Sequence, residues 1–166
     1  EVTGRGGGLT DAAFLKKKHV IEHALSLHAP DKNDPIDVLS KVGGFDLCAM
    51  TGVFLGAAIE HVPVVVDGFI SIVAALCASR LAPGAKAYFI GSHRSFEIGY
   101  RLAETELGLH PCLELGMRLG EGSGCLIAFR VVEAACAVMC TMATFPEAAI
   151  DDEYLTDIRA KDSFTV

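Results

Sequence analysis

The chain has 166 residues, of which 51% are hydrophobic and 21% are charged, and its net charge is -7. This is the length of one domain, and the apolar content is enough to build a sizeable core. The charge argues against nucleic acid as a partner, because the longest run of basic residues is Lys16-Lys17-Lys18.

The composition and the first residues also predict the cellular compartment of the protein and the presence of further segments that cover its apolar surface. Six cysteines lie among apolar neighbours and none forms a C-x-x-C pair, which predicts buried thiols in a reducing cytoplasm. Charges such as Arg130 and Glu133 interrupt the apolar stretches, so we expect no membrane span. The first residues, Glu1 to Arg5, have neither an initiator Met nor a signal peptide, which is typical of a cut into a longer chain. A mean hydropathy of +0.41 predicts apolar surface that another segment or subunit covers.

Helices are predicted in the first part of the chain. Thr10 or Asp11 can cap a helix that ends near His28. Asp34-Pro35 offers a cap followed by proline at the first helical position, which starts a short helix. Small apolar residues then predict a helix that is buried and closely packed. These three helices are expected at residues 11–28, 35–41 and 45–60.

Apolar β-branched runs then alternate with helices. Val62 to Val66 shows no polar alternation, which fits a strand covered on both faces, as in a parallel sheet. The repetition of this unit predicts an α/β fold, with a three-layer, Rossmann-like parallel sheet flanked by helices. The remaining elements are expected as strands at 88–91 and 113–115 and as helices at 69–81, 95–107 and from 124 onward. Nothing after Pro146 predicts firm packing, so we expect a loosely held tail.

Three loops follow the predicted strands and are expected to converge. Ligands bind at the carboxyl ends of parallel strands, which is where these loops lie. In the third loop, glycine N–H groups can approach an anion while Glu121 faces the same cleft; alternatively, the loop is a turn whose glutamate offsets a helix dipole. The loops are Asp67-Gly68, Ser92-His93-Arg94-Ser95 and Leu119-Gly120-Glu121-Gly122-Ser123-Gly124.

The first two loops each allow two interpretations. The second places two hydroxyls and a cation where they suit phosphate oxygens, or it holds a serine helix cap beside a solvated Arg94. Asp67 can orient a ribose or a basic group, or it can cap the next helix.

A metal site is not expected. The segment from His19 to His23 matches the H-x-x-E-H pattern of inverted zinc peptidases, yet no third ligand is evident, so we interpret the match as a chance surface feature. Cys136 and Cys140, one helical turn apart in an apolar stretch, are expected in the core.

Five motifs, in order and spacing, resemble the nicotinate-nucleotide:dimethylbenzimidazole phosphoribosyltransferase family. The likeness runs from about Thr3 to Phe145. It implies that residues 1–147 form the C-terminal part of a phosphoribosyltransferase α/β domain and that residues 148–166 are the loosely packed tail. The motifs are Gly4-Arg5-Gly6-Gly7-Gly8-Leu9, Val42-Gly43-Gly44-Phe45-Asp46, Pro63-Val64-Val65-Val66-Asp67-Gly68-Phe69, Ser92-His93-Arg94-Ser95 and Leu119-Gly120-Glu121-Gly122-Ser123-Gly124.

The resemblance implies an activity and a site. The family transfers phosphoribose from nicotinate mononucleotide to 5,6-dimethylbenzimidazole, giving alpha-ribazole phosphate and nicotinate in cobalamin lower-ligand synthesis. A cytoplasmic homodimer without metal or other cofactor is implied as well. By this resemblance Glu121 matches the general base, Lys17 matches a lysine of the nucleotide site, Asp67 falls at an acidic position lining the cleft, and Ser95, Gly122 and Gly124 match positions near the substrate phosphate.

Members of the family are roughly twice as long as this chain. Their N-terminal half supplies a second active-site glutamate and much of the benzimidazole pocket. We therefore expect a partial domain with little activity alone. The alternative is a catalytically inactive module that binds nucleotides or assembles with a partner chain.

Overall fold

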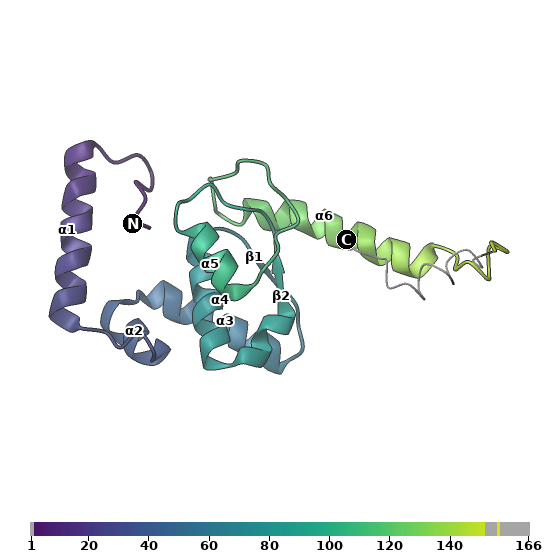
Figure 1. Cartoon of the computed structure of the whole chain (residues 1–166), viewed down its shortest axis with the longest axis horizontal. Coiled ribbons are helices and arrows are strands. Elements are labelled where there is room, and N and C mark those ends of the chain that lie inside the picture. The colour runs from purple at the N-terminus through teal and green to yellow at the C-terminus, as the bar shows by residue number, and fades with distance from the viewer. Residues whose placement is uncertain (1, 152–155, 157–166) are drawn as a thin grey trace. The chain divides into compact units, whose positions relative to one another are not determined.

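The chain divides into two compact units, residues 1–129 and 130–166. The computed structural model describes residues 2–151 and 156 (Figure 1). Most of the predicted tail at 148–166 lies outside the described residues, so the predicted division after residue 147 stays a prediction.

The first three helices begin where the sequence predicts, and side chains cap the first two. The Thr10 hydroxyl accepts a hydrogen bond from the Ala13 N–H at 3.4 Å, and the Asp34 carboxylate accepts one from the Ile36 N–H at 2.9 Å. These side chains satisfy N–H groups that have no partner within the first helical turn. The helices are α1 (Asp11–His28), α2 (Pro35–Val42) and α3 (Phe45–Ile59).

A small parallel sheet follows, which confirms the α/β class. Strands β1 (Val64–Val66) and β2 (Phe89–Gly91) pair in register, Val64 opposite Phe89. The third predicted strand is reduced to one parallel bridge, between His93 and Leu113. The remaining elements of the first unit are α4 (Phe69–Leu81), the 3-10 helix η1 (Pro83–Tyr88), α5 (Tyr100–Leu107) and the start of α6 (Ser123–Thr141).

The helix α5 begins five residues later than the predicted 95–107. Backbone pairing continues past β2, because the Arg94 N–H donates to Leu113 O at 2.8 Å and the Phe96 N–H donates to Met117 O at 3.0 Å. A segment held in this extended pairing cannot also form a helical turn. The loop that carries Ser95 is therefore anchored to its neighbour by backbone bonds on both sides of that residue.

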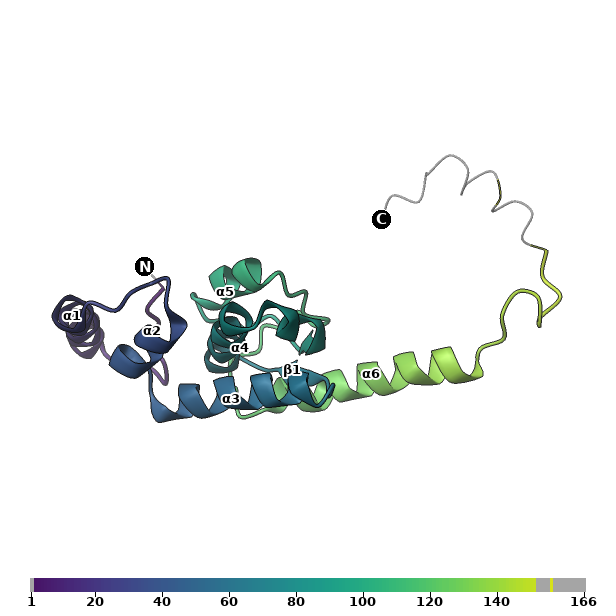
Figure 2. The same cartoon turned by 90° about the horizontal axis from the view of Figure 1, so that it is seen from below.

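The core of the first unit lies around α4. This helix contacts α3, α5, η1 and β1, and the views in Figures 1 and 2 both place it among them. Val66, Ile72 and Tyr100 are fully buried there, and the Phe54 and Phe89 rings meet edge to face at 4.9 Å between centroids. The core therefore fixes the carboxyl ends of β1 and β2, where the predicted site begins.

Two predictions of burial are wrong. The helix α3 was expected to be buried, yet Phe45 is 96% exposed and Ile59 is 73% exposed, while only Thr51 and Phe54 are buried. Among the described residues, α4 and η1 are the elements that pack extensively on α3, so the opposite side of this all-round apolar helix remains exposed.

The cysteines were also expected to be buried. All six are free thiols, but Cys48, Cys112, Cys136 and Cys140 are exposed and the other two are partly buried. Apolar neighbours in the sequence do not place a side chain inside when the helix that carries it exposes much of its surface, as α3 and α6 do, and Cys112 lies in the loop between α5 and α6. Burial raises the pKa of the two partly buried thiols, Cys77 and Cys125.

The helix α6 corrects the expectation that no stretch reaches the length of a membrane span. It has 19 residues with a mean hydropathy of 1.7, which is long and apolar enough to cross a membrane. The two charges inside it, Arg130 and Glu133, pair with each other at 2.6 Å and do not lower the hydropathy enough. One such helix is weak evidence for a membrane, because core helices of soluble proteins meet the same criterion.

We predict that Gly91→Ala lowers the free energy of unfolding by about 1–3 kcal/mol, because a Cβ at Gly91 would lie 2.9 Å from the Pro111 Cα in the backbone of the neighbouring segment. Urea denaturation measures this loss. Gly84→Ala is the matched control, since a Cβ there would meet no atom within 4 Å. Equal stability of the two variants would contradict the close packing of β2 on this segment.

Candidate functional site

The three predicted loops meet at one cavity of about 620 Å³ in the first unit. Asp67, Ser95 and Glu121 all line it, although they come from three separate segments of the chain. The first two loops begin where β1 and β2 end, so the sheet positions the residues that they bring to the cavity. Gly6 and Gly7 of the N-terminal segment line it as well.

The glycine-rich loop has an unusual backbone. Gly120, Glu121 and Gly122 have φ angles of +76°, +58° and +75°, all in the left-handed region. Glycine adopts this conformation freely, but a residue with a Cβ does so at a cost of roughly 1 kcal/mol. The strain at Glu121 therefore requires the neighbouring residues to hold the loop.

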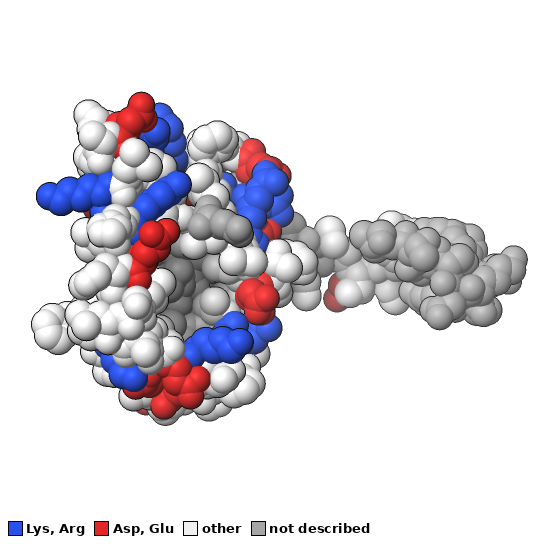
Figure 3. All heavy atoms as spheres, turned by 60° about the vertical axis from the view of Figure 1, so that its left-hand side comes forward, with Lys and Arg blue, Asp and Glu red and all other residues white. Residues whose placement is uncertain are grey.

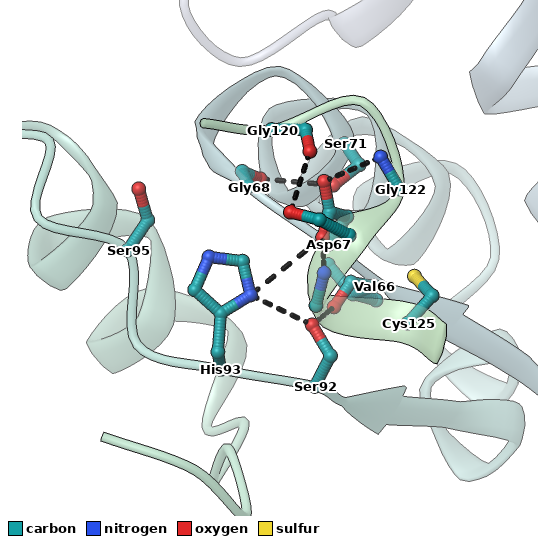
Figure 4. Close-up of polar contacts among 12 residues, drawn as sticks. Val66, Asp67, Gly68, Ser71, Ser92, His93, Ser95, Gly120, Gly122 and Cys125 are labelled. Carbon is teal, nitrogen blue, oxygen red and sulfur yellow. Dashed lines mark hydrogen bonds and ion pairs between the residues drawn. The ribbon is translucent and has the colours of Figure 1, made fainter. Parts of the chain in front are cut away.

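Asp67 holds this loop from the end of β1. Its Oδ2 accepts a hydrogen bond from the Gly122 N–H at 3.1 Å (Figure 4). Its Oδ1 accepts one from the Gly124 N–H at 3.0 Å. These N–H groups belong to the start of α6, so Asp67 caps that helix from another segment. A carboxylate also suits the positive end of a helix dipole.

This cap changes the expected role of the two glycines. Gly122 lines the cavity, but its N–H donates to Asp67. Gly124 is buried and is not among the residues that line the cavity. A Cβ at that position would clash with His93 Nδ1 and would lie 2.7 Å from Asp67 Oδ1. Close approach of α6 to Asp67 is thus the local reason for glycine at 124.

In the second predicted loop, Ser95 alone lines the cavity. Ser92 is fully buried and its hydroxyl donates to Val66 O at 2.6 Å. The Arg94 guanidinium binds both carboxylate oxygens of Glu104 and also pairs with Glu114 at 2.9 Å. The interpretation that Ser92 and Arg94 suit phosphate oxygens is therefore wrong, since both side chains are already bound within the protein.

Lys17 lies apart from the residues that surround the cavity. It belongs to α1, and its Nζ donates to Gly4 O at 2.8 Å. The connection to the site is indirect, because the bonded segment leads to Gly6 and Gly7 at the edge of the cavity.

Sequence reasoning missed the start of α4 as part of the site. Phe69, Ile70 and Ser71 line the cavity together with Gly68 of the first predicted loop, and Gly68 provides no side chain to cap the helix. The first-turn N–H groups of a helix have no partner within it, so they can bind an anion. Arg118 lines the same cavity, and only its position just before the glycine-rich loop could have indicated it.

Other kinds of site find little support in the described part of the chain. Among those residues, no group of three His, Cys, Asp or Glu side chains could hold a metal ion, and His19 and His23 are exposed on α1. Lys and Arg side chains alternate with Asp and Glu on the face drawn in Figure 3, which lacks a basic stripe of the kind that binds nucleic acid.

Comparison with known proteins gives the family. A family model described as phosphoribosyltransferase matches residues 1–150. The chain is 55% identical over 166 residues to a nicotinate-nucleotide–dimethylbenzimidazole phosphoribosyltransferase of Clostridium perfringens (strain ATCC 13124). The chain belongs to this family of phosphoribosyltransferases. A relative from Roseiflexus sp. (strain RS-1), with the same name, is 53% identical over 150 residues.

The similarity to these phosphoribosyltransferases covers part of each relative. The match includes all of this chain and 46% of the Clostridium perfringens protein, and 90% of this chain and 42% of the Roseiflexus protein. The chain thus spans about half the length of the curated relatives it matches. The crystal structure of CobT from Thermus thermophilus is similar with a TM-score of 0.83 and 36% identity, over 91% of this chain and 45% of that one.

We predict that Gly124→Ala lowers the melting temperature by several degrees, the effect of about 1–3 kcal/mol in a domain of this size. The added methyl group would displace His93 or Asp67, which lie against this glycine. Differential scanning calorimetry measures the shift. Gly68→Ala is the control at the same site, because a Cβ there meets nothing within 4 Å. A Gly124→Ala melting temperature equal to that of the control would contradict the close approach of α6 to this pair.

Proposed function

We propose that this chain carries the Glu121 side of an active site that transfers phosphoribose from nicotinate mononucleotide to 5,6-dimethylbenzimidazole. The observation that carries the proposal is the convergence of Glu121, Ser95 and Asp67 on one cavity of about 620 Å³. Membership of the family supports the choice of reaction, since the relatives are named for it. The products are alpha-ribazole phosphate and nicotinate.

Glu121 is the proposed general base. The bond from the ribose to the nicotinate nitrogen breaks as a benzimidazole nitrogen attacks the same carbon, and nicotinate leaves with the bonding electrons. The attacking heterocycle must lose its N–H proton, which a carboxylate within hydrogen-bond reach can accept. Glu121 lines the cavity from an exposed position, where its carboxylate is open to a ligand.

Ser95 and the start of α4 are the proposed phosphate site. Ser95 is 5% exposed, and its hydroxyl accepts from the Glu97 N–H at 3.4 Å, which leaves its own proton to donate. The first-turn residues of α4 line the same cavity, and the N–H groups of a first turn carry the positive end of a helix dipole. Gly122 and Gly124 act in this proposal through Asp67, because their N–H groups are bound to it. Lys17 acts through the N-terminal segment to which it is bonded.

We predict that Glu121→Gln lowers turnover by about 100-fold or more, as the loss of a general base does. The assay follows alpha-ribazole phosphate made by the 166-residue chain, alone and mixed with the part of the Clostridium perfringens relative that lies outside the match. We expect little transfer by the chain alone and measurable transfer by the mixture, because an enclosed site positions both substrates.

The control for this assay is Glu106→Gln, since Glu106 is an exposed glutamate on α5 that pairs with Arg80 at 3.4 Å. Its turnover should stay near that of the unchanged chain. Turnover of Glu121→Gln within a few-fold of this control would contradict the role of Glu121. Binding of nicotinate mononucleotide without any transfer would favour an inactive nucleotide-binding module.

A cytoplasmic homodimer without a cofactor completes the proposal. Six free thiols suit a reducing compartment. On α3, Phe45, Val53 and Ile59 are 96%, 61% and 73% exposed, and apolar side chains gathered on one helix favour association.

We predict that the chain associates in solution and that Phe45→Ser weakens this association, because the substitution removes the most exposed apolar side chain of α3. Size-exclusion chromatography with light scattering measures the mass. Val20→Ser is the control, as Val20 is a half-exposed apolar residue on α1. A monomer at all concentrations would contradict the proposed association.

A further inference from the structure

His93 is a buried polar side chain to which the proposed reaction gives no role. It is 1% exposed and packs against the start of α6 at Gly124. Its Nδ1 is 3.1 Å from the Ser92 hydroxyl and 3.6 Å from Asp67 Oδ1, as the dashed lines in Figure 4 show. Its Nε2 is buried and has no hydrogen-bond partner among the described residues. Among the described residues, the ring therefore makes its polar contacts through Nδ1.

The surrounding bonds determine which nitrogen carries the proton. The Ser92 hydroxyl donates its proton to Val66 O at 2.6 Å, and a backbone carbonyl can only accept. Both carboxylate oxygens of Asp67 act as acceptors, since each accepts a hydrogen bond from a glycine N–H. Neither neighbour can thus donate to His93 Nδ1, so Nδ1 must carry a proton. Its hydrogen bond goes to the Ser92 Oγ at 3.1 Å, while the Asp67 Oδ1, at 3.6 Å, faces the same Nδ1–H beyond hydrogen-bond distance. In the neutral ring, Nε2 is then an acceptor without a donor.

Ser92, His93 and Asp67 do not form a nucleophilic triad. In such a triad the serine and the carboxylate bind opposite nitrogens of the histidine, so that a proton can pass from the serine to the ring. Here both Ser92 and Asp67 face Nδ1, and Ser92 is fully buried. Ser92 therefore cannot attack a ligand, and the pair His93 and Asp67 needs another explanation.

The effect of His93 passes through Asp67. The Asp67 Oδ1 faces both the Gly124 N–H at 3.0 Å and His93 Nδ1 at 3.6 Å, while Oδ2 accepts from Gly122. The Nδ1–H attracts Oδ1 electrostatically across this distance, which is longer than a hydrogen bond, and so favours the carboxylate orientation in which each oxygen lies opposite its own glycine. Glu121, which directly precedes Gly122, is the residue of this loop that carries a Cβ in the left-handed conformation.

We propose that His93 is a positioning residue: its Nδ1–H orients Asp67 and so fixes the strained backbone on which the glycine-rich loop presents Glu121. The inference rests on the proposed function for the role of Glu121, but the structural part stands without it. A phenylalanine would fill the same space without leaving a buried acceptor unsatisfied, so the Nδ1–H is what a histidine adds here.

Two amide substitutions separate the nitrogens. His93→Asn retains a donor near the place of Nδ1, whereas His93→Gln carries its amide near the place of Nε2. Amide hydrogen exchange of the 166-residue chain is read at Gly122 and Gly124, with the bonded Leu109 N–H as the reference for global opening. We expect exchange at the two glycines to rise about 10-fold or more relative to Leu109 in His93→Gln and to change less than about 3-fold in His93→Asn.

The opposite pattern, with rescue by Gln and not by Asn, would overturn the proposal in favour of a role for Nε2. Exchange unchanged in both variants, or raised equally at Leu109, would also overturn it. If neither variant folds, nitrogen NMR of the histidine ring in the unchanged chain decides: a proton on Nδ1 supports the proposal, and a neutral ring protonated at Nε2 overturns it.

Turnover provides the link to function. In the active mixture, His93→Gln should lower kcat about 10-fold with little change in KM, His93→Asn should restore it, and neither should matter further once Glu121→Gln is present. Additive effects of His93→Gln and Glu121→Gln would overturn action through Glu121. If the mixture that contains the unchanged chain shows no transfer at all, the proposed function fails, while the exchange and NMR results still decide the role of His93.

Discussion

The rest of the site depends on the hydrogen bonds that the Asp67 carboxylate accepts from the glycine-rich loop. This carboxylate lies at the end of β1, accepts hydrogen bonds from the Gly122 and Gly124 N–H groups and faces His93 from the loop after β2. One side chain thus joins three segments that are far apart in sequence. The core around α4 fixes the position of Asp67, and Asp67 in turn fixes the loop that bears Glu121.

This constraint also decides where an anion can bind. The first turn of α6 has its N–H groups directed at a protein carboxylate, so a phosphate there would have to displace Asp67 and lie against its charge. The first turn of α4 has no side-chain cap and lines the cavity beside Ser95. We therefore propose different functions for the two helix starts: the start of α6 is capped internally and shapes a loop, and the start of α4 binds the anion.

The sequence predicted what depends on local chemistry. Caps at Thr10 and Asp34, the β-branched run of β1 and the convergence of three loops all follow from residue types at short range. It could not show which side of α3 is exposed, because that helix is apolar all round and has no polar face to orient it. Nor could it show that Arg94 binds Glu104 or that Asp67 caps α6, since those partners meet only through tertiary packing.

The most direct test of this account is a titration of the isotope-labelled chain with inorganic phosphate, followed by amide chemical shifts. The account predicts that the Ile70 and Ser71 amides at the start of α4 shift, together with Ser95, while Gly122 and Gly124 stay where Asp67 holds them. Shifts concentrated at Gly122 and Gly124, with α4 unchanged, would contradict it, because they would mean that Asp67 gives up its bonds to an anion.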